Sequence, residues 1–287
     1  MNRMRNAFQL LLLSFFLLKV SGQQNNFKIY NIEDGLPQST IFSILQDSRG
    51  YLWIGTEGGG LCRFDGINFV TFTKKDGLTG NTIRCILEDS YKNLWISTEN
   101  GLTFFNGLHF KPITVKYGIS GTVITSLAED QDHNVLVGTN DGGLNLIRML
   151  SKDSFSIKCY NQKFGLRSNF IMDIQIDKFN RIWLATLGGI DILSLNKEKD
   201  GVQWIKCPSG DQNELILTLA QDKNHNILFG TENSGVFYLP LTGIDSGKII
   251  SLTNKYKIRT VKTPNEAFGS RTAHSLRPRT FTNGKTK

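Results

Sequence analysis

The sequence predicts an all-β fold, a β-propeller of four-stranded antiparallel blades with five blades present. One motif recurs five times at blade-sized intervals, and each copy is a short apolar run between turn residues. Glycine is abundant and proline scarce, with 28 and 6 residues, as tight turns between many strands require. No 3.6-residue periodicity appears after the first 22 residues, which excludes stacked helical repeats.

The repeat is anchored on a strand-like segment with the pattern Leu-Trp-Ile-Gly-Thr. It stands at Leu52–Thr56 and Leu94–Thr98, and weaker copies follow at Val135–Thr139, Ile182–Thr186 and Ile227–Thr231. The spacings are 42, 41, 47 and 45 residues, within the range of a propeller blade. The anchor segment is therefore expected to form strand B of each blade.

Four further positions keep the same register relative to the anchor. Twelve residues before it stands an isoleucine, at Ile41, Ile83, Ile124, Ile171 and Ile216. Six before it stands an aspartate, at Asp47, Asp89, Asp130, Asp177 and Asp222. Eighteen before it stands a glycine, at Gly35, Gly77, Gly118, Gly165 and Gly210. Two after it stands a small residue, at Gly55, Ser97, Gly138, Ala185 and Gly230.

Each of these positions has a structural interpretation. The isoleucines begin a short β-branched strand A, as a buried inner strand should. The aspartates open the A–B turn, where an Asp side chain accepts hydrogen bonds from backbone amides two residues on. The small residues stand where adjacent blades approach closely. We interpret the five aspartates as turn formers and not as metal ligands or acid–base groups. His133 and His225 share one turn position with Gly50, Lys92 and Asn180, which likewise marks a turn.

The chain divides into three parts. Residues 1–22 have a basic start (Arg3, Arg5), an apolar stretch and a small-residue exit at Val20-Ser21-Gly22, which is typical of a secretory signal peptide. An uncleaved N-terminal anchor is the alternative, favoured by Lys19. Residues 23–243 form the propeller, with blades at about 35–76, 77–117, 118–164, 165–209 and 210–253. Residues 254–287 form a basic tail without blade register, expected to be disordered. The predicted location is periplasmic or secreted, with no membrane span after signal cleavage.

Charge is unevenly distributed along the chain. The formal net charge is +8, but ten basic and only two acidic residues lie from Asp245 onward. A nucleic-acid partner is expected to leave a basic patch on the fold itself, so none is expected here. The cysteines Cys62, Cys85, Cys159 and Cys207 lie in apolar strand-like segments, and we expect them to be structural. No metal site and no cofactor are predicted.

One known family resembles the first repeat closely. The segments Gly35-Leu36-Pro37, Ile41 to Ile44, Gly50 to Thr56 and Gly59-Gly60-Leu61, with Asp47 between them, resemble the two-component regulator propeller repeat. The resemblance covers about residues 27–240. It implies the periplasmic sensor region of Bacteroidetes hybrid histidine kinases, a role in signal transduction, and a second propeller or signalling subunit as partner. Such propellers have seven blades, so the five repeats predict a truncated ring or a stand-alone derivative. The kinase residues are missing from this chain, and no enzyme activity is expected.

Ring closure has two alternatives. Phe27–Asn31 reads as an isolated outer strand D, which could complete blade five beside Val236–Leu239 and so hide two free edges. Ile249–Leu252 could instead serve blade five as its own strand D, leaving an open ring.

Function is expected on the rim where the D–A and B–C loops gather, because loops on a rigid scaffold carry binding sites. The polar residues there suit an oligosaccharide or another polar small ligand. The candidate ligand-binding residues are Gln38, Glu57, Asn81, Glu99, Asn100, Asn140, Asp141, Arg167, Asn169, Glu232 and Asn233. Two other functions compete with ligand sensing: a protein-interaction propeller, and a propeller lyase or glycosidase.

Overall fold

The computed structural model describes residues 27–151, 154–195, 201–206, 214–241 and 247–253. The predicted signal peptide at 1–22 and the predicted disordered tail at 254–287 lie outside these residues, as does Cys207. The described part holds five antiparallel sheets of four strands, each in simple sequence order from the inner to the outer strand. The all-β propeller prediction is confirmed.

Each sheet lies inside one predicted repeat. The first comprises β1 (Ile41–Gln46), β2 (Leu52–Thr56), β3 (Leu61–Phe64) and β4 (Phe69–Phe72). The second comprises β5 (Ile83–Glu88), β6 (Leu94–Thr98), β7 (Gly101–Phe105) and β8 (Phe110–Ile113). The third comprises β9 (Ile124–Glu129), β10 (Val135–Thr139), β11 (Leu144–Ser151) and β12 (Ser154–Tyr160). The fourth comprises β13 (Ile171–Ile176), β14 (Arg181–Thr186), β15 (Gly189–Ser194) and β16 (Gly201–Lys206). The fifth comprises β17 (Ile216–Gln221), β18 (Ile227–Thr231), β19 (Val236–Leu239) and β20 (Ile250–Ser251).

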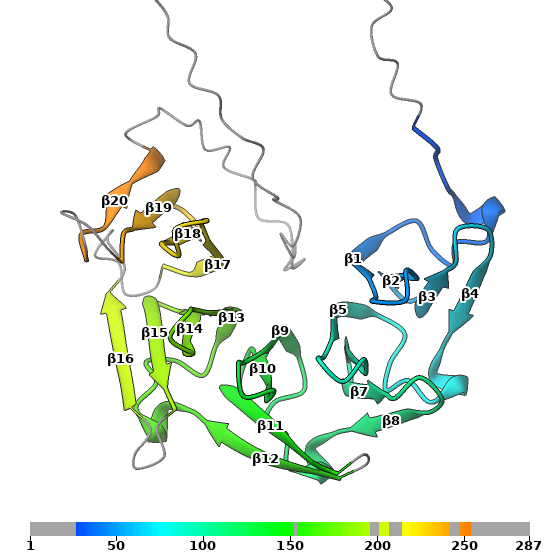
Figure 1. The fold of residues 1–287 in the computed structure, drawn as a ribbon, viewed down its shortest axis with the longest axis horizontal. Helices are drawn as coiled ribbons and strands as arrows, with labels where there is room; N and C mark the ends of the chain where they lie inside the picture. The colour runs from blue at the N-terminus through cyan, green and yellow to red at the C-terminus, as the bar shows by residue number, and fades with distance from the viewer. Residues whose placement is uncertain (1–26, 152–153, 196–200, 207–213, 242–246, 254–287) are drawn as a thin grey trace, which may run out of the picture.

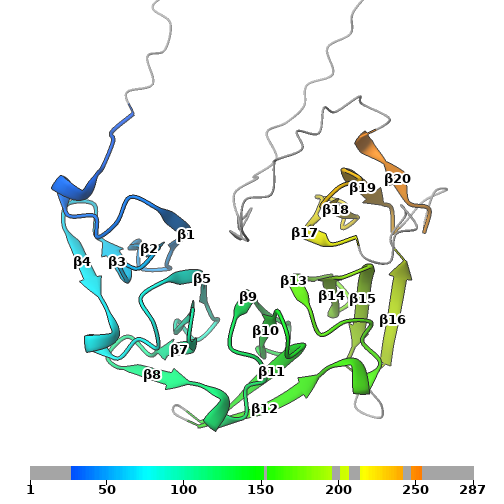
Figure 2. The same ribbon diagram turned by 180° about the vertical axis from the view of Figure 1, so that it is seen from behind.

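The blades fan out around a centre to which the five A strands are nearest, and the first and fifth blades do not meet (Figures 1 and 2). Of the two candidates for strand D of blade five, the structure contains the second, since β20 pairs with β19. The alternative in which Phe27–Asn31 closes the ring as a strand D is wrong, because these residues form no strand. Instead Tyr30 packs edge-on against Phe64 and Phe69 of the first blade, at centroid distances of 5.1 and 5.5 Å.

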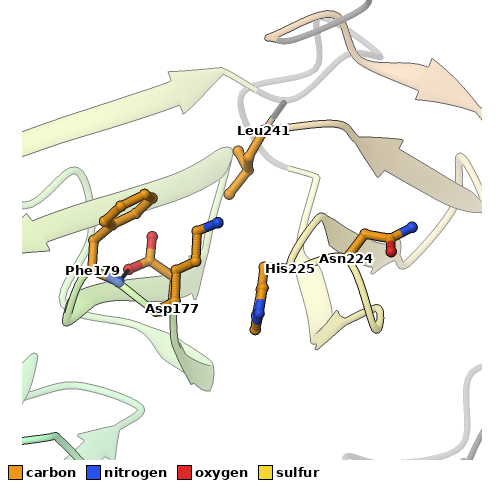
Figure 3. A pocket seen from close by; sticks show the side chains of 6 residues that line it. Asp177, Phe179, Asn224, His225 and Leu241 are labelled. Atoms are coloured by element: carbon orange, nitrogen blue, oxygen red, sulfur yellow. Dashed lines mark hydrogen bonds between the residues drawn. The ribbon is translucent and has the colours of Figure 1, made fainter. Parts of the chain in front are cut away.

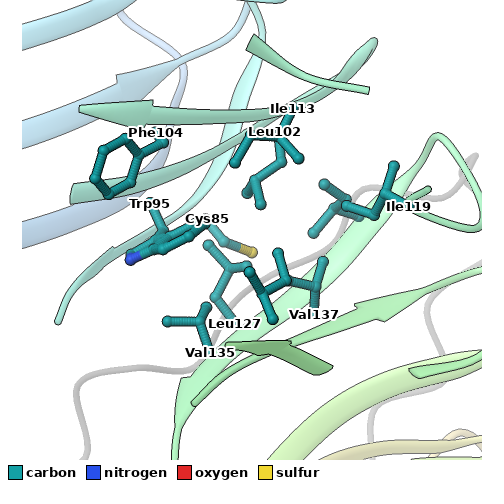
Figure 4. Close-up of a cluster of buried hydrophobic side chains, with 11 residues drawn as sticks. Cys85, Trp95, Leu102, Phe104, Ile113, Ile119, Leu127, Val135 and Val137 are labelled. Carbon is teal, nitrogen blue, oxygen red and sulfur yellow. The ribbon is translucent and has the colours of Figure 1, made fainter. Parts of the chain in front are cut away.

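The hydrophobic core lies between the blades. Figure 4 shows the cluster between the second and third blades, where Cys85, Trp95 and Leu102 face Leu127 and Val137. Similar clusters fill the other three interfaces between consecutive blades. At the free face of the first blade, Ile44 is 61% exposed, whereas its counterparts Leu127 and Ile174 are 7% and 6% exposed. Burial therefore depends on a neighbouring blade.

Close approach of the blades explains the small residue in strand B. A Cβ added at Gly55 would lie 2.9 Å from the carbonyl oxygen of Ile83, and one at Gly138 would lie 3.0 Å from Cγ2 of Ile171. Both contacts reach strand A of the next blade. A larger side chain would force two packed blades apart.

The repeated glycine ends a short 3₁₀ turn in the D–A loop. Such turns occur at η1 (Ile32–Asp34), η2 (Lys74–Asp76), η3 (Val115–Tyr117) and η4 (Gln162–Phe164). The glycine after each has a φ between 94° and 109°, a left-handed conformation that L side chains rarely adopt. The glycine is therefore conserved between repeats for its backbone and not for a ligand.

The repeated aspartates are turn formers, as predicted. In the second blade, Oδ1 of Asp89 accepts from the backbone N–H of Tyr91 and of Asn93, at 3.0 and 2.8 Å. The other four aspartates accept from the same two positions. The residue three after each aspartate has a positive φ: Gly50, Lys92, His133, Asn180 and His225.

Each aspartate also anchors strand B, a role that the sequence analysis missed. Oδ2 of Asp47, Asp89 and Asp177 accepts from the indole Nε1 of the anchor tryptophan at 2.9 to 3.0 Å. The third and fifth blades have leucine as the anchor. There Oδ2 of Asp130 and Asp222 accepts from Asn134 Nδ2 and Asn226 Nδ2 instead. The carboxylate thus stays partnered in every blade.

Candidate ligand-binding rim

The D–A and B–C loops form one continuous rim. In the first, third and fourth blades the B–C loop is tied to the D–A loop of the next blade: Gly60 N–H donates to Asn81 O at 2.8 Å, and Gly143 N–H donates to Asn169 O at 3.0 Å. Gly188 N–H donates to Glu214 O at 2.8 Å in the same way. We call this edge of the propeller the upper rim, and it is the edge that the sequence analysis selected.

Four of the predicted site residues hold these loops in place. Glu99 accepts from the backbone N–H of Asn81 and of Thr82, at 3.0 and 2.8 Å. Asn81 Oδ1 accepts from the backbone of Lys74, and Asn169 Oδ1 accepts from that of Gln162. Gln38 accepts from the backbone of Ser39. Their polar atoms are used by the fold itself.

Five predicted site residues are exposed instead, and none of their side chains forms a hydrogen bond or ion pair with another described residue. They are Glu57, Asn100, Asp141, Glu232 and Asn233. The last two predicted residues are partly buried. Asn140 Oδ1 and Arg167 Nη1 are buried atoms without a hydrogen-bond partner among the described residues.

One position of strand C recurs beneath this rim and faces the D–A loop. In the second blade Thr103 Oγ1 accepts from the backbone N–H of Thr79 at 3.0 Å. In the third blade Asn145 Oδ1 accepts from the backbone N–H of Ser120 at 2.7 Å. In the first blade the loop residue is Pro37, which has no N–H, and the strand residue is Cys62. The polar residue in strand C therefore accompanies a loop N–H that needs an acceptor.

In the fourth blade this position is a carboxylate, Asp191. Its Oδ2 accepts from the backbone N–H of Arg167 at 2.9 Å, and its side chain is fully buried. Burial raises the pKa of the Asp191 carboxyl to about 6, against the opposing effects of the Arg167 backbone bond and charge. Its Oδ1 has no hydrogen-bond partner in the described structure. The sequence analysis missed Asp191, although aligning strand C across the repeats would have exposed the single acid.

Arg167 does not bond to Asp191 through its side chain. Its guanidinium carbon lies 4.7 Å from the ring centroid of Trp204, a residue that the sequence analysis also missed. Trp204 stands directly opposite Asp191 in the β15–β16 pair, so the two side chains project on the same face of the sheet. Trp204 is 58% exposed. The fourth blade thus brings a buried acid, a guanidinium and an exposed indole together.

The opposite edge of the propeller carries the A–B turns and a hollow of about 410 Å³, lined by Glu129, Gln131, Lys178, Gln221 and His225 among others. Figure 3 shows the adjoining pocket between the fourth and fifth blades, with Asp177, Phe179, Asn224, His225 and Leu241 around it. Asp177 cannot serve a ligand freely there. Burial alone would raise the pKa of Asp177, but bonds from the Trp183 indole and from Arg181 lower it below its usual value.

Metal and thiol chemistry have no assembled site in the part of the chain that the structure describes. No three His, Cys, Asp or Glu side chains of that part come together as metal ligands. Cys62, Cys85 and Cys159 are free thiols. Burial raises the pKa of Cys85 to about 12 and that of Cys62 above its ordinary value, which makes both poor nucleophiles. None of the described helices has the length and apolar character of a membrane span.

The five four-stranded sheets and the repeated motif together define the described part of the chain as a β-propeller. The sequence profile of the two component regulator propeller family matches residues 35–58, 77–100 and 165–188. These are the first, second and fourth repeats, the three with a tryptophan anchor. The resemblance to the two-component regulator propeller repeat is confirmed.

The matched regions are small parts of longer proteins. Histidine kinase P4 of Formosa agariphila is 43% identical over 70 residues, which are 23% of this chain and 5% of that protein. Two solved structures are extracellular domains of proteins described as hybrid two component systems of Bacteroides thetaiotaomicron. Their TM-scores are 0.62 and 0.64 at 23% and 22% identity, covering 78% of this chain and 31% and 32% of theirs. The chain thus shares the fold of part of these extracellular domains and spans about a third of their length.

Propellers with other roles share the fold as well. Virginiamycin B lyase from Staphylococcus aureus superposes with a TM-score of 0.57 at 13% identity, over 79% of this chain and 74% of the lyase. At such identity the likeness concerns the fold alone.

Proposed function

We propose that the chain is an extracytoplasmic ligand-sensing propeller, with a role like that of the sensor region of a two-component histidine kinase. The observation that carries the proposal is the match of three repeats to a regulator-propeller profile. The exposed polar side chains of the upper rim, Glu57, Asp141 and Glu232 among them, supply groups that a polar ligand can bind. An oligosaccharide is the ligand class that these hydroxyl-binding groups suit best.

Calorimetric titration of the full chain with oligosaccharide pools from neutral and acidic polysaccharides tests the proposal. Binding heat with no change in the mass spectrum of the pool supports a sensor. Turnover of the pool contradicts it and favours the second candidate, a propeller lyase or glycosidase, to which the lyase superposition lends a structural precedent. Neither heat nor turnover favours a protein-interaction propeller.

Location belongs to the same proposal. The basic start and apolar stretch of residues 1–22 support export with cleavage after Gly22, and the neighbouring structures are extracellular domains. N-terminal sequencing of the chain from a periplasmic fraction should begin at Gln23. A chain that keeps Met1 in the membrane fraction would favour an uncleaved anchor instead.

The proposed signalling partner is a second propeller or a separate signalling subunit. This follows from the relatives, in which the matched region is a small share of a longer protein.

A further inference from the structure

The fourth blade differs from the second and third blades at three aligned positions of the upper rim. In the third blade these positions hold Ser120, Asn145 and Cys159. In the second blade they hold Thr79, Thr103 and Pro112. In the fourth blade they hold Arg167, Asp191 and Trp204. Comparing the blades shows what the scaffold itself requires.

In the second and third blades the aligned groups satisfy one another. Thr79 Oγ1 lies 2.9 Å from Thr103 Oγ1. Ser120 Oγ donates to Asn145 Oδ1 at 2.9 Å, and Asn145 Nδ2 donates to Ser120 O at 3.0 Å. In both blades the loop residue and the strand C residue are therefore hydrogen-bonded to each other, and we call such a pair closed.

In the fourth blade two polar atoms of the aligned residues have no hydrogen-bond partner in the described structure. The Arg167 side chain stacks on Trp204, and Arg167 Nη1 and Asp191 Oδ1 are both buried without a hydrogen-bond partner in the described structure. Asp191 is 0% exposed. Buried polar atoms in native proteins nearly always have a hydrogen-bond partner, either in the protein or in another molecule. The Arg167 Nη1 donor and the Asp191 Oδ1 acceptor therefore indicate that another molecule binds to them.

A hydroxyl group fits that requirement. It can accept from Arg167 Nη1 and donate to Asp191 Oδ1 at the same time. The exposed Trp204 indole beside the pair offers an aromatic surface for an apolar ring face. A pyranose ring carries both features, hydroxyls on its edge and C–H groups on its face. A single water could bridge the two atoms but would leave the indole uncovered.

We propose that Arg167, Asp191 and Trp204 form a monosaccharide subsite on the fourth blade. The proposal rests on the proposed sensing function and assigns its ligand class and place. The subsite holds the sugar by a hydroxyl between the guanidinium and the carboxylate and by contact with the indole.

Tryptophan fluorescence tests the subsite directly. Trp53, Trp95 and Trp183 are at most 1% exposed, so acrylamide quenching of the folded chain reports mainly on Trp204. Each of glucose, galactose, mannose, glucuronate and galacturonate is titrated at millimolar concentration. We expect at least one sugar to protect Trp204, and we expect Asp191→Asn to weaken that protection at least tenfold. Asparagine is the residue of the third blade at this position, so the fold accommodates it.

A second variant keeps the test decisive if Asp191→Asn alters the fold. Arg167→Ser with Asp191→Asn installs the pair of the third blade, and circular dichroism and the unfolding midpoint confirm folding. Protection by no sugar, or equal protection in both variants and the wild type, overturns the subsite and indicates a bridging water only. If the oligosaccharide pools still bind the wild type, the proposed function survives that result. If they do not, both proposals fail.

Discussion

Blades three and four have the same four strands and the same turn geometry, yet they differ at both edges of the propeller. At the A–B turn, Asp130 is partnered by Asn134, whereas Asp177 is partnered by Trp183 and Arg181. In both turns each carboxylate oxygen of the aspartate accepts a hydrogen bond. At the upper rim the Ser120–Asn145 pair is closed, whereas Arg167 and Asp191 leave atoms open. The difference at the turn keeps the polar atoms partnered and so maintains the fold, whereas the difference at the rim leaves the two unpartnered atoms on which the proposed subsite rests.

The largest loss of folding stability should come from removing the turn aspartate of the fourth blade, compared with that of the third. Asp177→Ala should cost about 3–4 kcal/mol, because it leaves the buried Trp183 indole N–H and the Arg181 guanidinium without an acceptor. Asp130→Ala should cost about 2 kcal/mol, because Asn134 can reorient more easily than a packed indole. Urea unfolding of both variants measures the difference. Equal costs would contradict the view that the tryptophan bond makes the fourth blade depend more on its aspartate.

The second effect concerns pH and Asp191. Burial raises the pKa of Asp191 to about 6, so the folded state holds this proton more tightly than the unfolded chain. The associated stability is fully present below about pH 4 and is lost as pH rises through 6. Asp191→Asn removes the titration, so its stability relative to wild type should increase by about 2 kcal/mol between pH 4.5 and 7.5.

Urea unfolding at both pH values measures that increase, and the difference between the two proteins cancels other titrating groups. Asn145→Ala at the aligned position of the third blade is the control, because it removes no ionisable group. A wild-type-to-variant difference that stays constant with pH would show that Asp191 has an ordinary pKa.

The smallest effect is expected at the left-handed turn position. His133 and Asn180 have φ of 62° and 59°, where glycine is free of strain. Asn180 also ties two blades together, since it accepts from Gln131 N–H and donates to Asp132. Asn180→Gly should therefore lower the stability by about 1 kcal/mol. His133→Gly should change it by less than about 0.5 kcal/mol, because its Glu129 contact is exposed. Thermal unfolding checks the pair, and a reversed order would contradict this difference.

Much of the scaffold could be predicted from the sequence, because the same residue pattern marks the strands and turns of every repeat. The inner isoleucines, the turn aspartates and the small residue of strand B reflect constraints that act five times. The bond from Trp53, Trp95 or Trp183 to its aspartate was not predicted, since it depends on how strands A and B bring residues six apart into contact. The hydrogen bonds of rim side chains such as Glu99 could not be predicted either, because the partners of Glu99 lie in a different loop.

The site could be predicted only as a rim. Arg167 was among the candidates because it lies in a D–A loop, but Asp191 and Trp204 lie in strands and carry no loop signal. Their meaning comes from register, since Asp191 pairs with Trp204 across β15 and β16 and faces Arg167. A polar residue in strand C is ordinary in this chain, as Thr103 and Asn145 show. Asp191 differs from them in being an acid and in having an unpartnered oxygen.

The most direct test of the central claim compares two matched double variants in one calorimetric titration with the oligosaccharide pools. Arg167→Ser with Asp191→Asn gives the fourth blade the closed pair of the third. Ser120→Thr with Asn145→Thr gives the third blade the closed pair of the second. The account predicts at least a tenfold loss of affinity for the first variant and less than a twofold change for the second. Equal affinities of the two variants would contradict it.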